Sequence, residues 1–191
     1  MEWPRQGDRL FRWEEDCHFN ACLNWYIPNL ATVARSYKEG ADALARAVRE
    51  GDATLDTVIL PIVFMYRQYI ELSLKDAVQT ARAIEGKNAS YPKHHNLKDL
   101  WAEAKELVKQ HYGMDTPREI DFVGPCIEDI HEHDPESFSF RYPTDKKGKK
   151  NLSGLSHINL RNLYETMNRL ASFFDCIIGD LDQKLESRAP S

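Results

Sequence analysis

The feature that most constrains the fold is a segment, from about Thr57 to Ile84, that is apolar on almost every side. Its apolar residues follow the helical repeat and leave too narrow a polar face for a helix that lies on a protein surface. We therefore expect a central helix over 57–84 with other helices packed around it. Pro61 is expected to occupy its first turn or to kink it.

Three further segments carry apolar residues at helical spacing and have recognisable ends. They run from Asn29–Leu30 to Gly51, from the capping residue Asn96 to Gly113, and from Leu160 to Leu185. We expect Gly40 to weaken the first of these helices and to divide it in two.

A shorter helix is predicted from Thr116–Pro117 to His133, with an interruption at Gly124–Pro125. Periodicity then disappears over 134–156, where only 138–142 shows the alternation of a strand. The fold class is therefore all-α. We expect a single-domain bundle of about five helices with one long irregular basic loop before the last helix.

Length and charge limit the organisation further. A chain of 191 residues is long enough for one domain with a sizeable core. We expect an N-terminal extension packed on the bundle over 1–28, the bundle itself over 29–185, and a frayed tail over 186–191. The net charge of −5 excludes attraction of the whole surface to nucleic acid or to an anionic membrane, so polyanion binding would require a local basic patch.

The chain begins without an apolar run of the signal-peptide type, and its longest apolar run, 58–66, is too short to cross a bilayer. We therefore expect a cytoplasmic protein with no membrane partner. The cysteines are scattered and are expected to be reduced. They are Cys17, Cys22, Cys126 and Cys176. A zinc site on Cys17, His18 and Cys22 would match no standard spacing, so no metal or other cofactor is expected.

Charged residues recur every four positions within the central apolar segment, at Arg67, Glu71 and Lys75. This spacing places them on one helical face. The simpler interpretation is a solvated stripe of ion pairs. A second interpretation is a groove in which Arg67 and Lys75 bind phosphate and Glu71 holds them in place. The apolar surroundings leave little room for the solvated face.

Several histidines are candidates for chemistry. His94 and His95 precede Asn96, the capping residue of the helix expected to start at Leu97. An imidazole at this place either has a structural role or acts as a general base within reach of a substrate. His131 and His133 with their acidic neighbours suggest a metal site. Residues two apart on a helix diverge, however, so we favour a charged helix end.

The segment 138–150 is the one strongly basic patch of this acidic chain. It combines aromatic rings with cations: Phe138, Phe140, Arg141, Tyr142, Lys146, Lys147, Lys149 and Lys150, with Asp145 among them. Rings beside cations fit a single-stranded nucleic acid or a nucleotide. A solvated lysine-rich loop explains the same pattern equally well.

Taken in order, short motifs along the chain resemble the HEPN superfamily. The residues that carry the resemblance are Arg67, Glu71, Leu74, Lys75, His95, Leu97, Leu100, Arg141, Tyr142 and Pro143. The resemblance implies a four- to five-helix bundle that is usually a homodimer through its long helices. It also implies a role in bacterial conflict systems, as a toxin, an abortive-infection effector or a nucleotide-binding accessory. Many such proteins are metal-independent endoribonucleases.

The chain departs from the catalytic signature of that superfamily, an Arg followed four to six residues later by His near the last helix. No histidine stands at this spacing after Arg141, His157 is more distant, and His157 with Arg161 has the reverse order. We therefore expect binding of RNA or a nucleotide-like phosphate ligand, in a defence or toxin–antitoxin context. The predicted ligand-binding residues are Arg67, Glu71, Lys75, Phe140, Tyr142, Asp145, Lys146 and Lys147, with charge also from Arg141.

Two alternatives stay open. One is a metal-independent endoribonuclease in which Arg141 acts with His157 or His95. There the histidine would deprotonate the 2′-hydroxyl and the arginine would stabilise the phosphorane. The other is a non-catalytic interaction or scaffold protein whose charged ladder is an internal salt-bridge network. A partner protein from the same operon is possible under any of the three readings.

Overall fold

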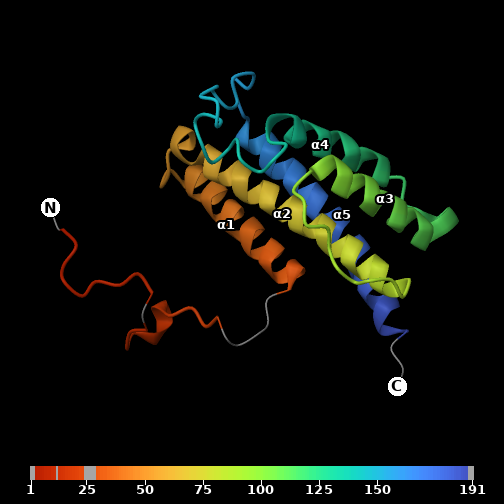
Figure 1. Cartoon of the computed structure of the whole chain (residues 1–191). Helices are drawn as coiled ribbons and strands as arrows, with labels where there is room; N and C mark the ends of the chain where they lie inside the picture. Colours follow the sequence, from red (N-terminus) through yellow and green to blue (C-terminus); the bar gives the residue numbers. More distant parts are fainter. Residues whose placement is uncertain (1–2, 12, 24–28, 189–191) are drawn as a thin grey trace.

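The structure, a computed structural model, describes residues 3–11, 13–23 and 29–188. The described residues form five α-helices and no β-strand, which confirms the all-α prediction (Figure 1). The helices are α1 (Leu30–Glu50), α2 (Leu55–Ile84), α3 (Leu97–Tyr112), α4 (Ile120–His133) and α5 (Leu160–Glu186). Short 3-10 turns cover Cys17–Phe19 and Gly113–Asp115.

The helix α2 is the centre of the bundle, as its sequence predicts. It packs on α1, α3 and α5, and α4 packs against α3 (Figure 1). Half of its 30 residues are buried, including Tyr66, Ile70 and Leu74. The helix begins at Leu55, so Pro61 lies in its second turn and the helix continues through it.

The helix α1 is continuous, so the division expected at Gly40 is wrong. Its start is fixed by a capping box in which Asn29 and Thr32 each accept a hydrogen bond from the other's backbone amide. Small residues such as Ala41 pack on α2, and a Cβ at Gly40 would lie 3.0 Å from the sulfur of Met65. The glycine therefore lets the two helices approach closely instead of breaking α1.

The predicted interruption of the fourth helix is also wrong. Helix α4 runs without a break from Ile120 to His133, with Pro125 in its second turn. Its buried face consists of Ile120, Val123 and Ile127. Burial of this face outweighs the single helical hydrogen bond that a proline removes.

The segment after α4 contains no strand at 138–142, contrary to the alternation in its sequence. The Asp134 carboxylate accepts hydrogen bonds from the amides of Phe138, at 2.5 Å, and Ser139, at 2.8 Å. The amide of Arg141 donates to the carbonyl of Phe138 at 3.1 Å. These bonds fold the segment into turns and use the amides that a strand would offer to a neighbour.

Both ends of the chain differ from the helical body. We expected 1–28 to pack on the bundle, but its described residues are exposed apart from the partly buried Asn20, and they run away from the bundle in Figure 1. At the other end, the Arg188 guanidinium donates to the carbonyl of Ile84 at 2.5 Å, which ties the start of the expected tail to α2. Residues 24–28 and 189–191 lie outside the described residues. Among the described helices, none combines the length and apolarity that a bilayer crossing requires.

Candidate functional site

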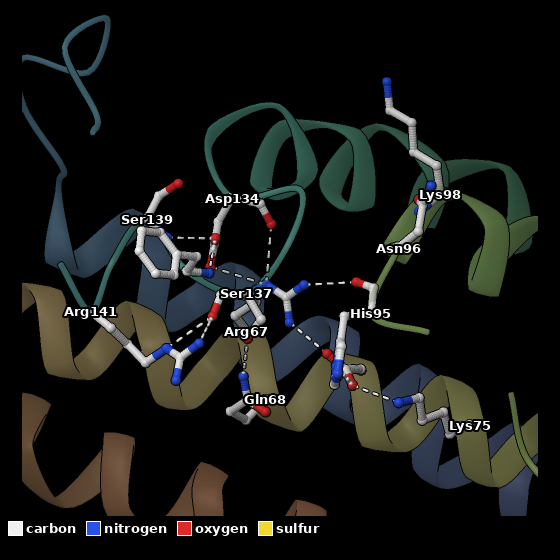
Figure 2. A network of polar contacts seen from close by, with 12 residues as sticks. Arg67, Gln68, Lys75, His95, Asn96, Lys98, Asp134, Ser137, Ser139 and Arg141 are labelled. Carbon is white, nitrogen blue, oxygen red and sulfur yellow. Dashed lines mark hydrogen bonds and ion pairs between the residues drawn. The ribbon is translucent and has the colours of Figure 1, made fainter. Parts of the chain in front are cut away.

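The three ladder residues of α2 are buried, so the solvated-stripe interpretation is wrong. Arg67 is 0%, Glu71 2% and Lys75 5% exposed. The segment before α3 and the turn after α4 cross this face of α2 and cover it (Figure 2). Since charges removed from water require partners, the question becomes what each of the three contacts.

All three nitrogens of the Arg67 guanidinium are in use. Nη1 lies 2.7 Å from Glu71 Oε2, Nε lies 3.1 Å from Asp134 Oδ2, and Nη2 donates to the carbonyl of His95 at 2.8 Å. Asp134 is itself fully buried. Arg67 therefore joins α2 to the end of α4 and to the chain that enters α3, and each of its nitrogens is engaged inside the protein.

Glu71 is the hub of the network. Its second oxygen, Oε1, lies 2.7 Å from Lys75 Nζ and 2.7 Å from His95 Nδ1. Burial acts to raise the pKa of the Glu71 carboxyl. The hydrogen bonds from Lys75, Arg67 and His95 outweigh burial, so the pKa lies below its ordinary value and the carboxylate is charged at neutral pH.

His95 is the network member that reaches the surface. Its side chain is 59% exposed, while its Nδ1 is held on the 3% exposed Glu71 side chain. The second ring nitrogen has no partner among the described residues. A buried carboxylate that holds one imidazole nitrogen fixes the ring orientation, which is how such pairs prepare a histidine to bind or to transfer a proton.

The chain around His95 is rich in cations and begins with an aromatic ring. Lys93 Nζ lies 4.2 Å from the centre of the Tyr91 ring, and Lys75 Nζ lies 5.9 Å from it. Lys93, His94 and Lys98 are exposed. The side chain of Asn96 accepts hydrogen bonds from the amides of Lys98 and Asp99, which begins α3 and fixes this surface. We call residues 91–98 the basic segment.

Arg141 lies on the same side of α2 but is held differently. Its Nε and Nη2 donate to the carbonyl of Ser137, at 2.9 and 2.5 Å, and its guanidinium lies 5.6 Å from the centre of the Phe64 ring. Gln68 of α2 donates to the Ser137 hydroxyl at 2.6 Å. The turn that carries Arg141 is thereby tied to α2 next to the Arg67 network (Figure 2).

The predicted stacking rings have different exposures. Phe140 is buried and packs inward, whereas Tyr142 is 48% exposed. One face of Tyr142 stacks on Phe138 with ring centres 4.5 Å apart. Of the two rings, Tyr142 is therefore the one with surface to offer a base.

The lysines that follow are presented by a tight turn. The Asp145 carboxylate accepts hydrogen bonds from the amides of Lys147, at 2.8 Å, and Lys149, at 2.9 Å. Gly148 allows the turn because its φ is +77°. Lys146 and Lys147 are exposed. Asp145 thus acts on its own turn, and the lysine side chains project outward.

His157 lies in another part of the molecule. It is exposed, its Nδ1 is 3.1 Å from Ser156 Oγ, and it lines a pocket of about 240 Å³ between α4 and α5 together with His133 and Phe140. No hydrogen bond or ion pair among the described residues joins it to Arg141. The sequence suggests Arg141, His157 and His95 as catalytic residues. Of these three, His95 is the one whose side chain contacts Glu71 among the described residues.

The remaining metal candidates are also separate. His133 Nε2 lies 4.0 Å from Asp129 Oδ1, and the pKa of His131 is lowered first by burial and then by the charges of Lys98 and Arg67. No group of three or more His, Cys, Asp or Glu side chains is arranged to hold a metal ion within the described part of the chain.

Sequence reasoning missed four residues of this site, namely Tyr91, Lys93, Lys98 and Asp134. Tyr91 and Lys93 belong to a Tyr-Pro-Lys stretch. We call residues 138–150 the basic loop, and this loop likewise combines a Tyr-Pro pair with lysines. That likeness is the signal in the sequence that could have pointed to Tyr91 and Lys93. Asp134 follows His133 at what the sequence suggests is a charged helix end. Its partner, Arg67, lies 67 residues away along the chain. Compared with models of known families, with curated proteins and with solved structures, the chain has no significant match.

Proposed function

We propose that this protein binds RNA or a nucleotide-like phosphate ligand at the basic segment. The observation that carries the proposal is the exposed imidazole of His95, whose Nδ1 is fixed 2.7 Å from the buried carboxylate of Glu71. The free side of the ring is thereby aimed outward before any ligand arrives. Pre-orientation of this kind lowers the entropy lost on binding.

The charge balance identifies which cations are available to phosphate. Glu71 and Asp134 neutralise Arg67 and Lys75 inside the protein. The positive charge at the surface comes from Lys93 and Lys98, which are exposed. Exposed lysines at a local patch provide the salt-dependent attraction that nucleic-acid binding requires. Tyr91 provides a ring beside them.

The buried part of the network has a positioning role in this proposal. Arg67 is 0% exposed, so it holds Glu71 and the His95 carbonyl and does not touch the ligand. Buried ion pairs are seldom more stabilising than well-packed apolar residues would be. Their benefit here is geometric, because they fix both the backbone and the side chain of His95.

The basic loop extends the proposed surface for a longer ligand. Its first residues are tied to α2 through Asp134 to Arg67 and through Ser137 to Gln68, so both basic regions are anchored on one flank of α2 (Figure 2). Tyr142 provides an exposed ring, and Lys146 and Lys147 provide exposed charges. The resemblance to the HEPN superfamily suggests a bacterial defence or toxin–antitoxin setting for this binding, and this setting is part of the proposal.

The test is the affinity of the purified protein for a labelled single-stranded RNA of mixed sequence, measured by fluorescence anisotropy across a salt series. We expect affinity to fall steeply with salt. The double variant Lys93→Ala/Lys98→Ala should weaken binding and reduce the salt slope by about one to two, because each lysine neutralises about one phosphate. The control is Lys105→Ala, which changes a lysine that lies on the same helix as Lys98 and pairs with Asp121. Equal binding by the double variant and the control would contradict the proposal.

A metal-independent endoribonuclease is the second candidate. The observation in its favour is the Glu71–His95 pair, which has the geometry of a carboxylate that orients a general base. His95 would take the proton of the 2′-hydroxyl, whose oxygen then bonds to phosphorus as the bond to the 5′-oxygen breaks and that oxygen takes a proton from water. Lys93 would stabilise the negative charge on the oxygens of the phosphorane. The pairing of Arg141 with His157 has no support from hydrogen bonds or ion pairs among the described residues.

A time course of labelled total RNA in the presence of chelator separates the two candidates. Wild type would be compared with His95→Ala, Arg141→Ala and His157→Ala. Cleavage that His95→Ala abolishes would establish His95 as catalytic and move this candidate ahead. Intact RNA throughout, with binding retained, would support the binding function. Cleavage that depends on Arg141 and His157 but not on His95 would contradict the site as described.

A further inference from the structure

The N-terminal segment carries large apolar side chains that the rest of the chain does not cover. Trp3, Leu10, Phe11, Trp13, Phe19 and Leu23 are each between 71% and 95% exposed. We call the described residues 3–11 and 13–23 the arm. An isolated exposed apolar residue is ordinary, but six within one short segment expose more than a monomer usually leaves in water.

A second uncovered apolar surface lies on the bundle itself. A groove of about 460 Å³ runs between α4 and α5. Its apolar lining consists of Pro117, Phe122, Val123, Leu170, Phe173 and Ile177. Phe122 is 66% exposed, although neighbouring residues of α4 are buried. One charge of each sign, Glu119 and Arg169, lies at its edge.

The two surfaces match in kind, because both are apolar and carry aromatic rings. Each aromatic side chain buries about 150–250 Å², so the four aromatic residues of one arm would bury roughly 600–1,000 Å². Two arms would then bury about 1,200–2,000 Å² of their own surface, and a specific protein–protein interface buries about that much on both partners together. The arm does not lie in the groove of its own chain, since its side chains are exposed.

We propose that two copies of this chain form a symmetric dimer in which the arm of each copy packs against the α4–α5 groove of the other. Exchange of identical segments requires no surface beyond those that one chain already has. Neither the arm nor Phe122 belongs to the proposed RNA site, so the dimer is tested independently of RNA binding.

The first test is the mass of the full chain in solution, measured by light scattering after size exclusion in reductant across a concentration series. We expect a dimer. Phe11→Asp in the arm and Phe122→Asp in the groove should each raise the dimer dissociation constant at least tenfold. Met114→Asp is the matched control, because Met114 is fully exposed and is not part of the groove lining.

Mixing the two variants tests reciprocity. A Phe11→Asp chain keeps an intact groove, and a Phe122→Asp chain keeps an intact arm, so the mixture can form one intact arm–groove pair. We expect dimer to reappear in the mixture and not in either variant alone. A monomeric wild type at all concentrations would overturn the proposal. So would a dimer that Phe11→Asp leaves unchanged, because the interface would then exclude the arm.

The native cysteines allow a direct test of which groove the arm occupies. Cys17 and Cys22 lie on the arm and are exposed, and Cys176 lines the groove and is exposed. A bismaleimide added to a mixture of isotopically light and heavy chains should join a light arm cysteine to a heavy Cys176. Crosslinks confined to chains of one isotope would show the arm in its own groove and would overturn the exchange.

Discussion

Two partly or fully buried carboxylates of α2 lie five residues apart and respond to burial in opposite ways. Glu71, on the side covered by the chain around His95 and Asp134, has its pKa lowered because three cations or donors outweigh desolvation. Asp76 lies toward Asp182 of α5, and burial followed by the charge of Asp182 raises its pKa to about 6. Burial alone therefore does not identify a site, whereas burial with converging partners does.

The largest expected effect on stability comes from removing the carboxylate of Glu71, which joins Arg67, Lys75 and His95. Glu71→Ala leaves Arg67 and Lys75 buried without their shared carboxylate, and should lower the free energy of unfolding by about 3–5 kcal/mol. Urea denaturation at pH 7 measures this loss. Glu71→Gln, which keeps the shape of the side chain, should lie between wild type and Glu71→Ala. A loss below about 1 kcal/mol would mean that the network does not brace α2.

A smaller loss of stability is expected when Asp134, the other carboxylate of the same network, is changed. Asp134→Asn keeps an oxygen for the amides of Phe138 and Ser139 but removes the charge opposite Arg67. We expect it to lower stability by about 1–3 kcal/mol, the range for a buried group left without its partner. The same denaturation experiment applies, with Glu136→Gln, an exposed neighbour, as the control. A variant as stable as the control would remove Asp134 from the network.

Neutralising Asp76, the carboxylate of α2 that lies toward α5, should raise the free energy of unfolding instead of lowering it. Because the pKa of Asp76 is raised to about 6, its carboxylate destabilises the folded protein at neutral pH. Asp76→Asn should therefore raise stability at pH 7 by about 1–2 kcal/mol, after allowance for the partial exposure of the group.

Stability should depend on pH in opposite ways at Asp76 and at Glu71. A raised folded pKa gives a contribution to stability that is present below the ordinary value of 3.8 and is lost as pH rises through about 6. A lowered pKa, as at Glu71, gives a contribution that is present above 4.5 and is lost as pH falls through the folded value. Unfolding curves between pH 4 and pH 8 should thus show the advantage of Asp76→Asn shrinking on acidification. A constant advantage would contradict the shift.

The smallest effect on stability is expected in the basic loop. Lys146 and Lys147 are exposed and are held only through their backbone, so Lys146→Ala/Lys147→Ala should change the free energy of unfolding by less than about 0.5 kcal/mol. RNA affinity should fall, since two cations that would neutralise phosphate are removed. Anisotropy and urea denaturation on one preparation measure both quantities. A variant with full affinity would confine the binding surface to the basic segment.

Much of the fold could be predicted because its signals are local. The apolar pattern of α2 and α5 follows the helical repeat, and residues at the helix ends such as Asn96 and Gly51 act within one turn of their own position. Two of the errors occurred where a distant contact decided the outcome. Gly40 belongs to a continuous helix because Met65 of α2 packs against it, and 138–142 forms turns because the buried Asp134 binds its amides.

The candidate site divides in the same way. The placement of Arg67, Glu71 and Lys75 on one face of a helix follows from their spacing, because four residues make about one turn. The burial of this face and its completion by Asp134 and His95 depend on how the helices pack, and His95 is the member of this network that reaches the surface. Spacing along one helix is a local property of the backbone. Partners 24 and 67 residues away meet only when the bundle closes.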